Sequence, residues 1–175
     1  GHERAGPAVL AALRRRTAHP PGVALWTVQT FNPDGVARGT RQNARGVDLN
    51  RQQPFAWRPL PRGTYFSGPR PRSEPESRAI ARLVKRIAPD AAIWYHQALE
   101  IVGGRGPVAR AYADAVGLPF GTIRGDYPGS ITRWQEHRLP QTTPMVVELA
   151  AGALTSGQVR LHVRALARAG KMVPA

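Results

Sequence analysis

The sequence contains no cysteine, few acidic residues and no long apolar run. Without cysteine, disulfide bonds and thiolate chemistry are excluded for this 175-residue chain. No apolar stretch approaches the roughly 20 residues that a membrane-spanning helix needs, so we expect no membrane span. Eleven acidic residues stand against 25 lysines and arginines, which gives a net charge of +14. This excess favours an acidic partner: nucleic acid, an anionic cell wall or a carboxylate-bearing substrate.

Nucleic acid is the least favoured of these three partners. The arginines are scattered along the chain, with no basic block beyond LRRRTAH at residues 13–19. Aromatic residues make up only 7% of the sequence, and the motifs of DNA- and RNA-binding folds are absent. We therefore expect no nucleic-acid partner.

The pattern of apolar residues predicts one α/β domain over residues 1–175. The hydrophobic content of 42% is that of a globular chain long enough to bury a core, and we find no repeat or low-complexity linker. Strands that alternate with helices predict a mixed, largely parallel central sheet flanked by helices on both faces. We expect helices at 3–16, 73–87, 107–117 and 156–170, and buried strands at 23–31, 91–96 and 144–150.

Two short motifs and one long segment complete this prediction. NPDG at residues 32–35 is interpreted as a turn after the first strand, and SEPE at 73–76 as a capping box that begins a helix. Residues 36–72 are polar and rich in proline and glycine. A segment of that length without regular structure is usually functional or disordered.

Polar residues at the ends of the predicted strands are candidates for a ligand site, because open α/β sheets bind ligands there. His96 follows the strand AAIWY, and Glu148 lies within the apolar strand PMVVELA. Burying a carboxylate is unfavourable unless it is paired or used in chemistry. Each residue taken alone also has an ordinary structural explanation: a structural histidine for His96 and an ion pair with an arginine for Glu148.

Taken together, these residues resemble the zinc carboxypeptidase family. GHERAG is similar to the family's His-Gly-x-Glu-x-x-Gly motif without its first histidine. Within the family, the sequence is most similar to bacterial murein peptide amidases, which cut the γ-D-glutamyl–diaminopimelate bond of cell-wall peptides. That similarity rests on RQNARGVDLNRQQP (41–54), GPRPRSEPESRAI (68–80) and YPGSITRW (127–134). The family motifs follow one another in order: GHERAG (1–6), NPDG (32–35), GVDLNR (46–51), WYHQ (94–97), YPGSITRW (127–134) and VVEL (146–149).

The resemblance implies a zinc site and a catalytic base. Glu3 and His96 would be two of the three protein ligands of Zn²⁺, and a third ligand, a histidine, is expected directly before Gly1. Glu148 would act as the general base toward the attacking water, and Arg41 would stabilise the oxyanion of the tetrahedral intermediate. The resemblance also implies that strands preceding the first motif are missing from this sequence.

The resemblance further implies a site for the substrate's terminal carboxylate. Asn50 and Arg51 would hold that carboxylate, since the planar guanidinium of arginine matches a carboxylate through two hydrogen bonds. Tyr127 and Ile131 would contact the substrate's side chain. The arginine-rich stretch from 31 to 54 would then be an anion-binding loop that holds this carboxylate.

The implied function is a zinc-dependent peptidase that hydrolyses a C-terminal peptide bond, specifically γ-D-glutamyl-diaminopimelate in murein peptides. Two alternatives stay open: a general metallocarboxypeptidase or glutamate-trimming enzyme, and a non-catalytic relic that binds carboxylates. The expected partner is a peptide, either a cell-wall stem peptide or a protein C-terminus. The positive charge favours the cell envelope or secretion over the cytoplasm.

Overall fold

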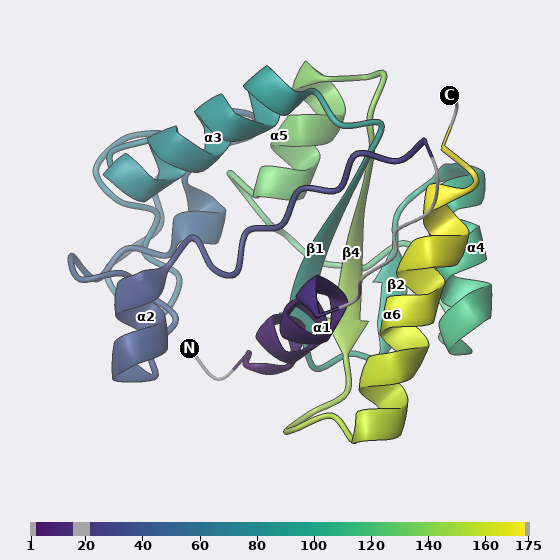
Figure 1. Ribbon diagram of the computed structural model, residues 1–175. Coiled ribbons are helices and arrows are strands. Elements are labelled where there is room, and N and C mark those ends of the chain that lie inside the picture. The colour runs from purple at the N-terminus through teal and green to yellow at the C-terminus, as the bar shows by residue number, and fades with distance from the viewer. Residues whose placement is uncertain (1–2, 16–21, 174–175) are drawn as a thin grey trace. The chain divides into compact units, whose positions relative to one another are not determined.

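The computed structural model describes residues 3–15 and 22–173 (Figure 1). Contacts between residues divide the chain into two compact units. We call Glu3–Gln29, Asp90–Ile123 and Thr143–Ala175 the sheet unit, and Thr30–Pro89 with Arg124–Thr142 the loop unit. The single domain expected over residues 1–175 stays a prediction.

The sheet unit is built on a four-stranded sheet with the strand order β1-β4-β2-β3. Strand β1 (Ala91–Gln97) pairs in parallel with β4 (Thr143–Leu149), and β2 (Ile101–Gly103) pairs in parallel with β3 (Phe120–Gly121). Strands β2 and β4 are antiparallel. The predicted α/β class with a mixed, largely parallel sheet is therefore confirmed. Strands β2 and β3 were not predicted, because two or three residues are too few to show a periodicity.

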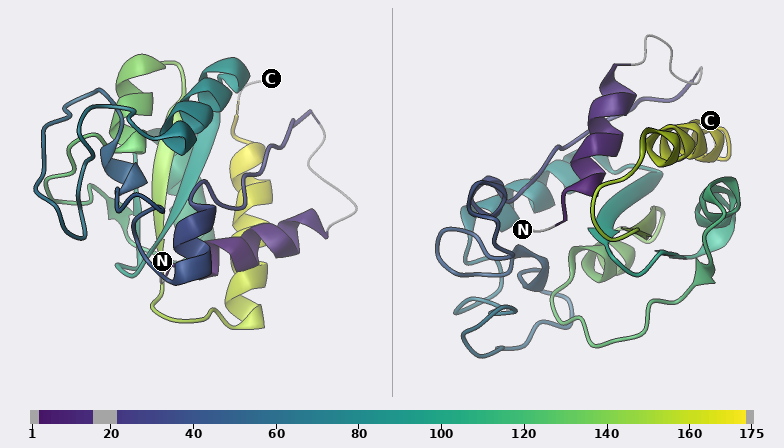
Figure 2. Two further views of the ribbon diagram at one scale, coloured as in Figure 1. Left: turned by 90° about the vertical axis from the view of Figure 1, so that its left-hand side faces the viewer. Right: turned by 90° about the horizontal axis from the view of Figure 1, so that it is seen from below.

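Three helices of the sheet unit pack on one another and on the sheet. Helix α6 (Ser156–Gly170) contacts both α1 (Ala5–Arg14) and α4 (Gly106–Val116), and it lies between them in Figures 1 and 2. Side chains alternate between the two faces of a strand, so every second residue of β4 points toward these helices. The core that results contains Met145, Val147, Leu149, Tyr112 and Ala165, all of them fully buried.

The loop unit contains short helices joined by long irregular segments. Its helices are α2 (Pro33–Arg38), the single 3-10 turn η1 (Leu49–Arg51), α3 (Pro75–Ile87) and α5 (Ile131–Arg138). The long polar segment expected at 36–72 is ordered through side-chain hydrogen bonds. Of the helices within residues 3–15 and 22–173, none combines the length and apolarity that crossing a membrane requires.

The strand predicted at residues 23–31 is wrong. This stretch has no strand structure, and its large side chains are exposed: 41% for Leu25, 64% for Trp26 and 41% for Val28. A β-branched and aromatic composition favours a strand only where a neighbouring strand accepts its backbone hydrogen bonds. No strand in the described part of the chain pairs with this stretch.

Two local predictions are also corrected. NPDG begins helix α2: Asn32 is the N-cap, its Oδ1 accepts from the Gly35 amide, and Pro33 occupies the first turn. The predicted capping box at SEPE is absent, because Glu74 is the N-cap of α3 and its side chain makes no capping hydrogen bond. The carboxylate of Glu74 instead bonds to the loop at Asn43.

A chain of hydrogen bonds crosses the core between the sheet and the helices. The hydroxyl groups of Tyr95 on β1 and Tyr112 on α4 are 3.0 Å apart, and Tyr112 Oη lies 2.9 Å from Nδ1 of His162 on α6. Burial raises the pKa of both tyrosine hydroxyls, so they stay protonated. Burial also lowers the pKa of the His162 imidazole below its usual value.

The lowered pKa of His162 predicts that the protein loses stability in mild acid. The folded state resists protonation of His162, whereas the unfolded chain takes up that proton near pH 6.5. The free energy of unfolding is therefore unaffected by protonation of His162 above about pH 6.5, and it declines as the pH falls below that value. We expect the free energy of unfolding, measured in urea between pH 7 and 5, to fall less steeply for His162→Gln than for the wild type. The exposed His137 supplies the control, and a His137→Gln variant that flattened the slope equally would contradict this account.

Candidate metal and carboxylate sites

Glu3, His96 and Glu148 meet at one end of the sheet unit. His96 and Glu148 are each the second-to-last residue of their strands, and the parallel register of β1 and β4 places them directly opposite one another. Glu3 lies two residues before α1, and its Oε2 is 3.0 Å from Nδ1 of His96. The structure thus brings together three predicted residues that are far apart in the sequence.

Strand alternation separates these polar residues from the helix-packed core. Met145, Val147 and Leu149 belong to the core beneath α4 and α6, so Glu148 projects from the other face of the sheet. Its side chain is nevertheless only 9% exposed. A carboxylate and an imidazole therefore lie side by side on neighbouring strands, with limited access to water.

The facing atoms of Glu3 and His96 fit two ligand positions of one zinc ion. Zinc binds nitrogen and oxygen ligands at about 2.0–2.2 Å, so two ligands at tetrahedral positions are about 3.3 Å apart. The observed separation of 3.0 Å between Glu3 Oε2 and His96 Nδ1 is close to that value. Within residues 3–15 and 22–173, no three histidine, cysteine, aspartate or glutamate side chains are arranged so that they could hold a metal ion together, so the neighbouring Glu148 does not complete a ligand set with Glu3 and His96. His2 lies outside the described residues.

A close contact between α1 and β1 determines where Glu3 lies. A Cβ atom added to Gly6 would be only 2.8 Å from Cβ of Tyr95, which is closer than real contacts of this kind. Gly6 is therefore the residue that lets the start of α1 rest directly on β1. Tyr95 precedes His96, so the same contact sets the distance from the start of α1 to the imidazole.

In the loop unit, Asp48 organises the predicted anion-binding residues. Its carboxylate is 2% exposed, accepts a hydrogen bond from Arg41 Nε at 2.7 Å, and caps η1 by accepting from the Asn50 amide at 3.0 Å. The side chain of Asn50 in turn accepts from the backbone amide of Ile131 at 3.0 Å. Ile131 is 1% exposed, and its predicted contact with a substrate side chain stays a prediction.

Arg51 lies close to two aromatic rings. Its guanidinium carbon is 5.4 Å from the ring centre of Tyr65 and 5.5 Å from that of Tyr127, within the range of cation–π attraction. Burial lowers the pKa of Arg51, and the nearby Asp48 carboxylate opposes that shift. No carboxylate among the described residues forms an ion pair with Arg51, although its side chain is only 5% exposed. Such a cation suits an anionic ligand.

Arg51 and the segment that carries Tyr127 are packed tightly against each other. Gly129 has a φ of +65°, and a Cβ atom added to it would lie 2.6 Å from the Arg51 carbonyl oxygen. The Gln53 amide donates to the Gly129 carbonyl at 2.8 Å. Glycine is therefore required at this position both by its backbone conformation and by the close approach.

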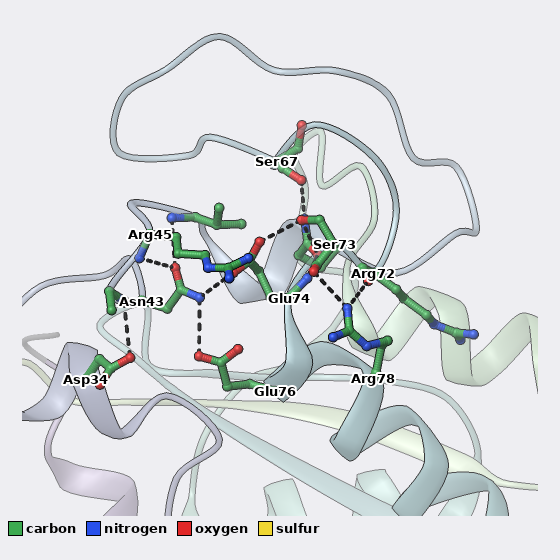
Figure 3. A network of polar contacts seen from close by, with 12 residues as sticks. Asp34, Asn43, Arg45, Ser67, Arg72, Ser73, Glu74, Glu76 and Arg78 are labelled. Atoms are coloured by element: carbon green, nitrogen blue, oxygen red, sulfur yellow. Dashed lines mark hydrogen bonds and ion pairs between the residues drawn. The ribbon is translucent and has the colours of Figure 1, made fainter.

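A buried polar network holds the anion-binding loop to the start of α3 (Figure 3). Glu74, which is 2% exposed, accepts hydrogen bonds from Asn43 Nδ2 at 2.9 Å and from Ser73 Oγ at 2.8 Å. Asn43 Oδ1 accepts from the amides of Arg45 and Val47, both at 3.1 Å, and this closes the loop that precedes Asp48. Two motifs that carried the resemblance, RQNARG and SEPE, are thus in direct contact.

The predicted site residues fall into two groups. Glu3, His96 and Glu148 come together in the sheet unit, and Arg41, Asn50, Arg51, Tyr127 and Ile131 come together in the loop unit. Sequence reasoning missed Tyr65, which lies against both Arg41 and Arg51. It also missed the structural roles of Asn43 and Glu74. The signal for Tyr65 was weak, because it is one of four aromatic residues in the polar segment 36–72 and belongs to none of the family motifs.

Comparison with known proteins defines the class to which this fold corresponds. Residues 22–103 match the model of the zinc carboxypeptidase family. The solved carboxypeptidase A of Helicoverpa armigera matches with a TM-score of 0.72 at 16% identity, covering 98% of this chain and 59% of that one. At that identity the match shows the fold alone. The fold is the zinc carboxypeptidase fold, and the resemblance expected from the motifs is confirmed.

The more specific relatives are murein peptide amidases. The chain is 34% identical over 123 residues to murein peptide amidase A of Escherichia coli strain K12, covering 61% of this chain and 51% of the relative. It therefore spans about half the length of this curated relative. The solved murein-tripeptide amidase of Escherichia coli O157 matches with a TM-score of 0.83 and 26% identity, over 100% of this chain and 79% of that one.

Asp48→Asn is expected to destabilise the loop unit. The change removes the charge that pairs with Arg41 Nε and leaves Arg41 and Arg51 to repel one another. A hydrogen bond to a charged group contributes about 1.5–3 kcal/mol, so we expect the free energy of unfolding in urea to fall by about 2 kcal/mol. Asp126→Asn, which breaks an exposed ion pair with Arg58, is the control and should leave stability nearly unchanged. Equal effects of the two variants would contradict the organising role of Asp48.

Proposed function

We propose that the protein is a zinc-dependent amidase that hydrolyses the γ-D-glutamyl–diaminopimelate bond of murein peptides. The observation that carries this proposal is the grouping of Glu3, His96 and Glu148 at one end of the sheet. The similarity to two murein amidases supports the choice of substrate. In the reaction, water adds across the amide and yields a γ-carboxylate and the free amine of diaminopimelate.

Glu3 and His96 would hold the zinc ion through Oε2 and Nδ1, the two atoms that face each other in the structure. When bound, zinc lowers the pKa of water to about 7 and polarises the substrate carbonyl. We propose that a histidine is the third protein ligand. The predicted cofactor is thus Zn²⁺, with two of its ligands on the described part of the chain.

Glu148 is proposed as the general base and then the general acid. Its position beside His96 in the strand register would place a carboxylate next to the metal ligands. It would accept the proton of the attacking water and later donate a proton to the departing amine. Low exposure restricts competing water around this carboxylate.

The loop unit would bind the anionic parts of the substrate. Arg51 and Asn50 are proposed to hold the terminal carboxylate of the peptide, with Tyr65 and Tyr127 fixing the plane of the guanidinium. Arg41, oriented by Asp48, is proposed to stabilise negative charge on the carbonyl oxygen during attack. The partner would be a cell-wall stem peptide, and the net charge of +14 favours a location at the cell envelope.

Glu148→Gln tests this proposal directly. Removing the base should lower kcat for the murein tripeptide by about 10²–10⁴-fold, the usual contribution of general acid–base catalysis. Zinc content, measured by atomic absorption on the full-length protein, should stay at the wild-type level because Glu148 is not a proposed ligand. Asp114→Asn, an exposed change of the same kind on α4, should leave kcat unaltered. If Glu148→Gln hydrolysed the tripeptide at the wild-type rate, the proposed mechanism would be wrong.

A further inference from the structure

Gln97, the last residue of β1, has no role in the proposed chemistry. Its side chain nevertheless makes three hydrogen bonds close to Glu3 and His96, the two proposed zinc ligands. Its Oε1 accepts from the backbone amide of Ala5 at 3.0 Å. Its Nε2 donates to the carbonyls of Ala150 at 2.7 Å and Gly152 at 2.8 Å. All three partners are backbone groups on segments that are distant in the sequence.

These partners lie next to the three residues proposed for zinc binding and catalysis. Ala5 follows Glu3 by two residues, Ala150 follows Glu148 by two residues, and Gln97 itself follows His96. The amide of Ala5 is in the first turn of α1, where no residue of the helix can accept its hydrogen. One side chain thus connects the start of α1, the end of β1 and the end of β4.

We propose that Gln97 is a positioning residue that holds Glu3, His96 and Glu148 in register with one another. This inference rests on the proposed function. The carboxamide is suited to the task because it carries an acceptor and a two-hydrogen donor on one rigid plane. Its oxygen sets the position of Glu3 relative to His96, and its nitrogen sets the position of Glu148 relative to His96.

The two ends of the carboxamide can be separated by substitution. Gln97→Glu keeps an oxygen that accepts from Ala5 but places a carboxylate oxygen against the carbonyls of Ala150 and Gly152, which repels them. Gln97→Ala removes all three hydrogen bonds. Gln97→Glu should therefore displace only the side chain of Glu148. Gln97→Ala should displace both the proposed metal ligands and the proposed base.

The experiment measures three quantities for each full-length variant: the dissociation constant for zinc, kcat for the murein tripeptide, and the melting temperature of the zinc-free protein. We expect Gln97→Ala to weaken zinc binding and to lower kcat, each about 10–100-fold, as for other residues that orient metal ligands. We expect Gln97→Glu to lower kcat while its zinc dissociation constant stays within a few-fold of the wild type.

Gln29 supplies a matched control, because its Nε2 also donates a hydrogen bond to the backbone of α1. The acceptor is the Pro7 carbonyl, at a distance of 3.0 Å. Gln29→Ala should change neither zinc affinity nor kcat. If Gln97→Ala lowers only the melting temperature and leaves zinc affinity and kcat at wild-type values, Gln97 is merely structural and the inference is wrong. The inference is also wrong if Gln29→Ala matches Gln97→Ala in all three quantities.

The outcome also separates this inference from the proposed function. A wild-type protein that binds no zinc would overturn both at once, because there would be no metal site to position. A wild-type protein that binds zinc and hydrolyses the tripeptide, combined with an unaffected Gln97→Ala variant, would overturn the role of Gln97 alone.

Discussion

The parallel pairing of β1 with β4 is the constraint on which the candidate catalytic site depends. Parallel strands place their carboxyl ends at the same edge of the sheet, and the register here puts His96 opposite Glu148. A shift of one residue would send one of these side chains into the helix-packed core. The fully buried Met145, Val147 and Leu149 oppose such a shift, since a slip of β4 by one residue would move them out of the core. Hydrophobic packing on one face thus fixes the polar chemistry on the other.

The loop unit is stabilised by polar interactions rather than by a hydrophobic core beneath a sheet. It has few regular elements, and its anion-binding residues are held by buried carboxylates. Asp48 accepts hydrogen bonds from Arg41 and Asn50, and Glu74 accepts one from Asn43. Buried carboxylates are stable only when hydrogen bonds or ion pairs surround them, so each one fixes the loop conformation that supplies its partners. The positive charge of this segment and its internal acids are therefore parts of one arrangement.

The sequence was sufficient to predict the helices and strands whose apolar residues recur with a clear periodicity, and the residues that belong to family motifs. Helices α3 and α6 and strands β1 and β4 were expected, and the motifs alone pointed to Glu3, His96 and Glu148. Residues 23–31 show the limit of such reasoning, because a strand is defined by its neighbour and apolar composition cannot supply one. Tyr65 and Gln97 could not be predicted because their contacts join distant segments and leave no local pattern.

The proposed zinc-dependent cleavage of murein peptides can be tested in a single assay. The most direct measurement incubates the full-length protein with L-Ala-γ-D-Glu-meso-diaminopimelate and assays free diaminopimelate, with and without a metal chelator. We expect release of diaminopimelate that the chelator abolishes and that added zinc restores. Zinc-loaded protein that releases no diaminopimelate, or release that the chelator leaves untouched, would contradict it.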